Sequence, residues 1–226
     1  MMFLHEDVPF APIERETIDG VRYYKAPGFE EYQKLPSITS VISHRNRDKF
    51  KAWRAKVGEE EANRVTRKAT SRGTDAHTLI EEYLNNVDTF SKVQPLSEFL
   101  FKQAKPDLNR INNILCQEQA LWSFELGIAG SVDCIAEFDG ELSIIDFKTS
   151  AKPKPREWIE DYFVQCAAYA CMLYEMKGIM VKKFVIIMTC ENGEVEVYEE
   201  YDKRKYIQLL SEYIREFVDS KLKEYA

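Results

Sequence analysis

The chain contains 226 residues, of which 45% are hydrophobic and 31% are charged, and its formal net charge is −7. These values are typical of one globular domain and exclude a disordered or collagen-like chain. No apolar run approaches the roughly 20 residues of a membrane span, and the opening MMFLHEDVPF lacks the features of a secretory signal, so we expect an intracellular protein that does not enter membranes.

Positive charge is concentrated in two places, although the net charge argues against a nucleic-acid partner. Residues 45–72 contain ten basic and four acidic residues. A second basic cluster lies within residues 148–156. Charge runs of this kind are most often solvated surfaces, and the alternative is a surface that binds phosphate groups.

The N-terminal third predicts a hairpin followed by helices. Residues 16–24 read as a hairpin around Asp19-Gly20. The hydroxyl of Ser37 can cap the helix that follows, and the alternative is that this helix start receives a DNA phosphate. Residues 46–70 have apolar positions three and four residues apart, which predicts an amphipathic helix with a break at Gly58.

The next helix is expected to begin at Arg72-Gly73 and to carry His77 and Glu81 on one face, because they are four residues apart. A lone histidine is more often structural than a ligand. Residues 91–114 predict one or two helices interrupted at Pro106. Residues 115–126 then alternate as in a strand, with Glu118 at a position that can share a face with Asp133.

The stretch from Gly130 to Ser150 predicts a hairpin whose turn is Asp139-Gly140. In that register Phe138 faces Glu141, and Asp133 faces Asp146. Like charges placed across two strands repel each other, and a bound cation is the simplest compensation. Lys148 shares the face of Asp146, because strand side chains alternate. Two carboxylates and one ammonium on one small surface suit phosphodiester hydrolysis.

The remaining elements complete a mixed α/β pattern. Pro153 and Pro155 keep the loop at residues 149–156 extended, and a helix with Trp158 in its apolar stripe is expected to run to about residue 176. Strands are predicted at residues 183–190 and 195–200, and a last helix at 204–221. This order predicts a central mixed sheet flanked by helices.

The spacing of these residues resembles a known family. G-S-V-D, eleven residues and then I-D-F-K-T is similar to the metal motif of the PD-(D/E)xK nucleases, with V-D in place of P-D. The opening R-Y-Y and P-S-I-T, the helical His77 and the later Q-x-x-x-Y resemble the RecB-like exonuclease branch, which includes mitochondrial and phage enzymes. The resemblance implies a restriction-endonuclease-like core at about residues 115–226, preceded by a helical portion at about 37–114, within one domain over 1–226.

The resemblance also implies roles for individual residues. Asp133, Asp146 and the carbonyl of Phe147 would hold Mg²⁺ or Mn²⁺, with His77 completing the ligands. Lys148 would assist the attacking water, while Gln165 and Tyr169 would support the reaction centre. Glu81 would orient His77 or contact a base. Contacts to DNA are expected from Ser37, Thr39, Arg72, Thr149, Lys152 and Lys154.

The five cysteines, at positions 116, 134, 166, 171 and 190, have no close C-x-x-C pair. Some RecB-like nucleases hold an iron–sulfur cluster with one cysteine before the motif and three closely spaced after it. That spacing is missing, so we expect buried free thiols and no cluster.

These observations lead to three hypotheses. The first is a metal-dependent DNA exonuclease that acts on single strands or ends, inside a cell, with a phage-infected cell as one setting. The second is a structure-specific endonuclease or resolvase that uses the same hairpin. The third is an inactive nucleic-acid-binding module. Replication or recombination proteins are the partners that the resemblance implies, without naming one.

Overall fold

The computed structural model describes residues 2–28, 31–88 and 90–224. A five-stranded sheet at its centre has the order β4-β5-β6-β7-β8. Its strands are β4 (Ile111–Ser123), β5 (Ile128–Phe138), β6 (Glu141–Ser150), β7 (Lys183–Cys190) and β8 (Val195–Glu200). The β6–β7 pair is parallel and the other neighbours are antiparallel. The predicted mixed sheet is therefore confirmed.

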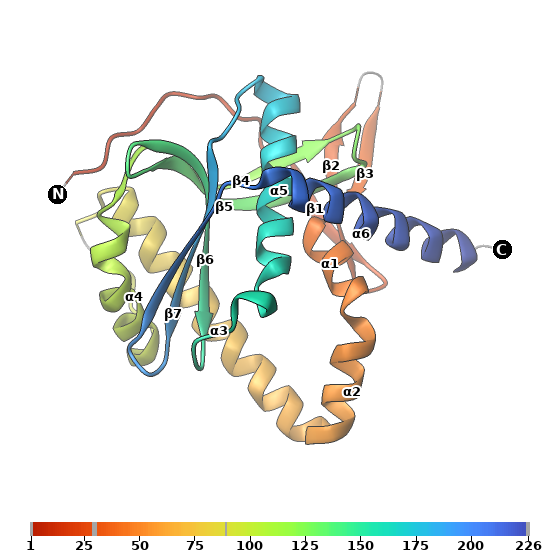
Figure 1. Cartoon of the computed structure of the whole chain (residues 1–226), viewed down its shortest axis with the longest axis horizontal. Helices are drawn as coiled ribbons and strands as arrows, with labels where there is room; N and C mark the ends of the chain where they lie inside the picture. The colour runs from red at the N-terminus through yellow and green to blue at the C-terminus, as the bar shows by residue number, and fades with distance from the viewer. Residues whose placement is uncertain (1, 29–30, 89, 225–226) are drawn as a thin grey trace.

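Helices cover both faces of this sheet (Figure 1). They are α1 (Ile38–Arg45), α2 (Arg47–Val57), α3 (Glu59–Leu84), α4 (Pro95–Leu108), α5 (Glu160–Lys177) and α6 (Lys203–Glu224). Buried residues of α1, α5 and α6 form one hydrophobic cluster with the sheet, and buried residues of α3 and α4 form another. Burial on both faces explains the continuous apolar run from Phe184 to Met188 in β7, all of whose residues are buried.

A second sheet of three strands packs against one end of the first. It has the order β1-β2-β3, with β1 (Glu14–Ile18), β2 (Val21–Pro27) and β3 (Tyr32–Pro36). The Asp19-Gly20 turn lies between β1 and β2, as predicted. Tyr24, Ala26 and Leu35 pack against Ala129 of β5. The third strand was not predicted, because YQKLP has no clear alternation of apolar residues.

Helices α2 and α3 form a projecting pair. Figure 1 shows α2 and the first half of α3 extending away from the body of the molecule, and α2 has no buried residue. The predicted break at Gly58 is present, with φ of +89°. The predicted helix start at Arg72-Gly73 is wrong, because α3 continues through both residues. Packing of Leu79, Ile80 and the rest of its buried face outweighs the roughly 1 kcal/mol that an interior glycine costs a helix.

Three further boundaries differ from expectation. Pro106 lies in the last turn of α4 and does not interrupt the helix. Strand β4 begins at Ile111, so part of the segment expected to be helical is strand. Trp158 is 71% exposed, because it lies in a 3₁₀ turn, Arg156–Trp158, that precedes α5 and does not share the buried face of that helix. Among the described residues, no helix combines the length and apolar character needed to cross a membrane.

Candidate metal centre

The candidate centre lies where β5 and β6 separate. The hairpin has the predicted register, with Phe138 opposite Glu141, and pairing continues to Cys134 opposite Ile145. Asp133 and Asp146 are next in that register, but the ladder ends before them. The remainder of β6 pairs with β7 alone, and the remainder of β5 pairs with β4 alone.

Asp133 occupies the point of separation. Val132 and Cys134 belong to hydrophobic clusters on opposite faces of the sheet, although residues two apart in a regular strand share a face. The alternation is therefore interrupted at Asp133. Its Oδ2 accepts a hydrogen bond of 2.9 Å from the backbone N–H of Phe147, so a side chain replaces the strand pairing that has been lost.

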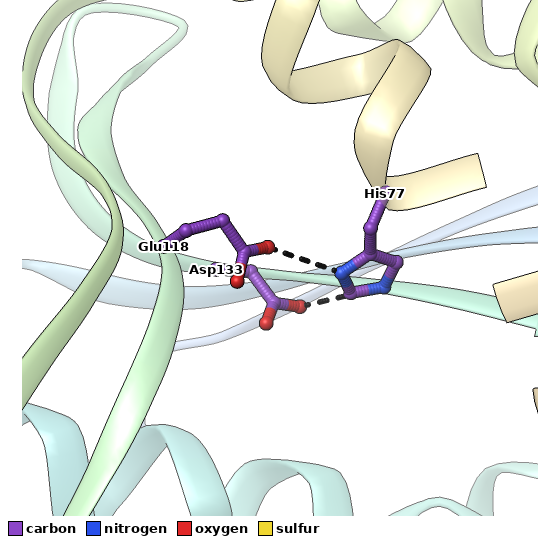
Figure 2. A group of neighbouring side chains, drawn as sticks. All are labelled: His77, Glu118 and Asp133. Carbon is purple, nitrogen blue, oxygen red and sulfur yellow. Dashed lines mark hydrogen bonds and ion pairs between the residues drawn. The ribbon is translucent and has the colours of Figure 1, made fainter. Parts of the chain in front are cut away.

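His77 reaches this point from α3. Its Nε2 lies 2.8 Å from the carbonyl oxygen of Phe147 and 3.9 Å from Oδ2 of Asp133, and its Nδ1 lies 3.3 Å from Oε1 of Glu118 (Figure 2). One ligand atom each from His77, Glu118 and Asp133 lie within 4.8 Å of one another. The structure therefore brings a helical histidine and two strand carboxylates together.

Glu118 is the residue of this group that the sequence identified least clearly. Its neighbours Gln117 and Gln119 pair with Cys134 and Val132, which places Glu118 opposite Asp133. Its φ is +46°, a left-handed conformation that costs a non-glycine residue about 1–2 kcal/mol. Backbone strain of this kind is often found at functional sites. The signal in the sequence was its alternation with Ala120 and Trp122, which did not fix its backbone conformation.

The two carboxylates strongly influence the pKa of His77. Burial alone would lower this pKa, but the charge of Asp133 and the hydrogen bond to Glu118 outweigh burial and raise the pKa to about 9. The imidazolium then donates from Nε2 to the Phe147 carbonyl and from Nδ1 to Glu118. In this arrangement, protons occupy the positions at which a cation would bind.

Asp146 is held by Lys148. The lysine Nζ lies 2.6 Å from Oδ1 and 2.5 Å from Oδ2 of Asp146, which is 1% exposed. Burial raises the pKa of Asp146, to about 7, against the opposing effect of the Lys148 ammonium. The ammonium also lies 5.1 Å from the ring centroid of Tyr162 on α5. Asp146 is therefore outside the compact group of three ligands and is neutralised by Lys148.

Gln165 and Tyr169 lie on α5, which packs against β5. The Gln165 amide donates to the Tyr169 hydroxyl at 2.9 Å, and both side chains are buried. A side chain on Gly130 would place its Cβ 2.8 Å from Tyr169 and 2.9 Å from Ile38. Glycine is required there because α5 and α1 both approach the strand closely. The hydrogen bond of the Gln165 amide thus goes to Tyr169.

The six predicted DNA contacts are in different environments. Ser37 is buried and caps α1 by accepting from the N–H of Ser40 at 3.1 Å, and its hydroxyl lies 2.9 Å from that of Thr39. The capping role is therefore confirmed, and the phosphate role stays a prediction. Lys152 is exposed, whereas Lys154 donates to the hydroxyl of Tyr162 at 2.6 Å.

Arg72 and Thr149 bind each other. The guanidinium of Arg72 donates to the Thr149 hydroxyl at 3.0 Å and is paired with Glu191 at the end of β7. Arg72 is only 9% exposed. In this structure the two residues connect α3 to the ends of β6 and β7, and their contact with DNA stays a prediction.

The residues present fit a divalent cation. Carboxylate and carbonyl oxygens are suitable ligands for Mg²⁺ or Mn²⁺. Oδ2 of Asp146 is buried and accepts no hydrogen bond of good geometry from any described residue; its close neighbour is the Lys148 ammonium. A cation bound near Asp133 would give this Asp146 oxygen a coordination partner.

Comparison with known protein families identifies the family of this chain. A model described as the PD-(D/E)XK nuclease superfamily matches residues 49–224. The chain belongs to this superfamily, and the predicted resemblance is confirmed.

Individual relatives carry a more specific name. The mitochondrial genome maintenance exonuclease 1 of Xenopus tropicalis is 31% identical over 147 residues, which is 60% of this chain and 42% of that protein. The human protein of the same name is 26% identical over 131 residues, which is 54% of this chain and 38% of that protein. The aligned part is thus less than half the length of either relative.

A solved structure shows the same fold. It belongs to a provisionally named exonuclease from Eubacterium rectale and superposes with a TM-score of 0.50 at 14% identity, over 69% of this chain and 66% of that chain. This likeness supports the core architecture of the nuclease fold.

Proposed function

We propose that the chain is a divalent-metal-dependent deoxyribonuclease that hydrolyses phosphodiester bonds as an exonuclease, on single-stranded DNA or DNA ends. One observation carries the proposal: His77, Glu118 and Asp133 converge where β5 and β6 separate, beside the buried Asp146–Lys148 pair. Membership of the nuclease superfamily and the exonuclease name of the relatives support it. DNA is the proposed partner, and no protein partner is proposed.

The proposed ligands are His77, Asp133, Asp146 and the carbonyl of Phe147, together with Glu118. Bound Mg²⁺ or Mn²⁺ would position the scissile phosphate and lower the pKa of a water molecule. For this, His77 must lose its proton and turn a nitrogen lone pair toward the site.

Lys148 is the proposed catalytic cation. Its ammonium lies against Asp146 and can orient the attacking water or neutralise charge that develops on the phosphate. Gln165 and Tyr169 are proposed to support β5 and the scissile strand. The basic residues of α2 and of the loop after β6 supply the electrostatic attraction for the DNA backbone that the net charge of −7 does not.

The setting of the reaction follows from its substrate. We propose that the activity operates inside the cell, where DNA is found. The relatives reported above are vertebrate proteins named for mitochondrial genome maintenance. A phage-infected cell is therefore not part of this proposal.

Product analysis with end-labelled DNA tests the proposal. Linear single-stranded DNA, linear duplex and a circular single strand are incubated with the protein and Mg²⁺ or Mn²⁺, with and without a chelator. We expect short products from the linear single strand from the first time point, an intact circle, and no products with the chelator. Cutting of the circle would instead identify an endonuclease. Failure to cleave any substrate with either metal would exclude both enzyme hypotheses and favour an inactive nucleic-acid-binding module.

A further inference from the structure

A cavity of about 480 Å³ is lined by two of the three ligand candidates, His77 and Glu118. The carboxylate of Glu81 also lines it, and α3 contributes Gly73, Thr74 and Thr78. Arg15, from β1 of the small sheet, also lines the cavity and is its only lysine or arginine among the described residues. The cavity therefore joins the candidate metal centre to a guanidinium supplied by a different sheet.

The packing of the two sheets explains how Arg15 reaches this position. Arg15 pairs across the strands with Tyr24, so the two side chains share one face of the small sheet. Tyr24 is buried in a cluster against which Ala120 and Trp122 of β4 pack. Glu118 precedes Ala120 by two residues on that strand. The packing of Tyr24 against β4 thus positions Arg15 close to Glu118.

The guanidinium of Arg15 is exposed and makes no hydrogen bond or ion pair with another described residue. Lys25, on the neighbouring strand, is different, because it pairs with Glu14 at 3.1 Å. A guanidinium presents five fixed donors that match the oxygens of a phosphate group. The exposed Thr74 adds a hydroxyl donor to the same cavity, so the cavity offers two donors for an anion next to the metal ligands.

We propose that Arg15 is a substrate-binding residue that holds a phosphate of the DNA strand next to the one that is cleaved, with Thr74 as a second donor. This inference rests on the proposed function. Arg15 would fix the position of the strand relative to Asp133 and His77, and it would bind the substrate and the transition state equally. Its loss should therefore raise KM and leave kcat nearly unchanged.

Three single variants of the full chain test this role. Arg15→Gln removes the charge, and Arg15→Lys keeps it without the guanidinium fork. Lys25→Gln is the matched control, because it removes one positive charge from the small sheet at a position on its opposite face. Initial rates on end-labelled single-stranded DNA with Mn²⁺ give KM and kcat. We expect KM to rise about tenfold in Arg15→Gln, less in Arg15→Lys, and by less than about twofold in Lys25→Gln.

A binding measurement makes the result independent of catalysis. Fluorescence anisotropy of a labelled oligonucleotide, without divalent metal and at several salt concentrations, gives the dependence of affinity on salt. The slope should decrease by about 1 in Arg15→Gln relative to the Lys25→Gln control. If the two variants have the same KM and the same salt slope, the inference is wrong even though the wild type cleaves DNA. If the wild type does not cleave with any metal, the proposed function fails, and the anisotropy still decides whether Arg15 binds DNA.

Discussion

The carboxylate of Asp133 accepts a hydrogen bond from the backbone N–H of Phe147 across 2.9 Å, at the place where the two strands stop pairing. The same carboxylate belongs to the group formed with His77 and Glu118. One side chain thus completes the backbone hydrogen bonding and supplies a candidate ligand.

Two substitutions at Asp133 separate these contributions. Asn retains an oxygen that can accept from Phe147, whereas Ala does not. Both variants should lose at least about 100-fold in metal-dependent cleavage, because a charged ligand is missing. In urea unfolding, Asp133→Ala should be less stable than Asp133→Asn by about 1–3 kcal/mol, because a buried donor is left without a partner. Equal stabilities of the two variants would show that the hydrogen bond to Phe147 is unimportant.

Lys148→Met should reduce the cleavage rate by at least about 100-fold, because the proposed charge stabilisation in the transition state is lost. It should also destabilise the protein, because Asp146 would stay buried without its cation. Rates on linear DNA and thermal unfolding measure the two effects, and Lys182→Met, at an exposed position directly before β7, is the control. Unchanged digestion by Lys148→Met would mean that the reaction centre lies elsewhere.

The positive φ of Glu118 predicts a difference between two substitutions. Glycine adopts this conformation without strain, whereas alanine does not. Glu118→Gly should therefore be at least as stable as Glu118→Ala and up to about 1 kcal/mol more stable, while both weaken metal binding. Denaturant unfolding and titration with Mn²⁺ test this pair. Higher stability of the Ala variant would contradict the strain observed at this position.

Tyr162 provides a test of how Lys148 is positioned. Tyr162→Phe keeps the ring, 5.1 Å from the lysine nitrogen, and loses the hydroxyl that Lys154 contacts. Tyr162→Leu removes the ring as well. A ring–ammonium interaction in a partly desolvated place is worth about 1–2 kcal/mol, so kcat should fall about tenfold in the Leu variant and stay within about threefold in the Phe variant. Equal kcat values in the two variants would exclude a role for the ring.

The pKa of His77, raised to about 9, predicts the dependence of metal binding on pH. Because a proton must leave before the imidazole can bind a cation, apparent Mg²⁺ affinity should increase about tenfold per pH unit between pH 6.5 and 8.5. Isothermal titration at several pH values measures this slope. His77→Gln should have a flatter profile, and an unchanged slope would remove His77 from the ligands.

The same shift affects the stability of the protein without metal. Because the folded state raises this pKa above the unfolded value of about 6.5, the protonated imidazole stabilises the fold. That contribution is complete below about pH 6.5 and is lost as pH rises through 9. Urea unfolding of wild type and His77→Gln should therefore differ more at pH 6 than at pH 9.5.

Much of the central sheet was predictable from local features. The Asp139-Gly140 turn fixes the register of β5 and β6, and buried strands such as β7 are continuous apolar runs. The separation of β5 from β6 was not predictable, because a side chain replaces the strand pairing there by accepting a hydrogen bond from the backbone of the facing strand. Because the strands separate there, the sequence pattern placed Asp146 opposite Asp133 but did not show that Asp146 is paired closely with Lys148.

The candidate site was predictable only in part. His77 was identified by resemblance, and its contact with Phe147 depends on how α3 packs across the sheet. To identify Glu118 as a ligand, one would have to know the register of β4 and a positive backbone angle that no local sequence motif specifies. Arg15 had no signal at all in the sequence, because its position depends on the contact between two sheets.

The hairpin connects the two halves of the sheet through only five residue pairs, from Phe138–Glu141 to Cys134–Ile145. Beyond these pairs, the hydrogen bond from the Phe147 N–H to Asp133 connects the two halves. A cation shared by Asp133 and Asp146 would strengthen this connection, so metal binding in the absence of DNA should slow amide exchange at Phe147. Substrate binding and the rigidity of the sheet would then both depend on the contact between Asp133 and Phe147.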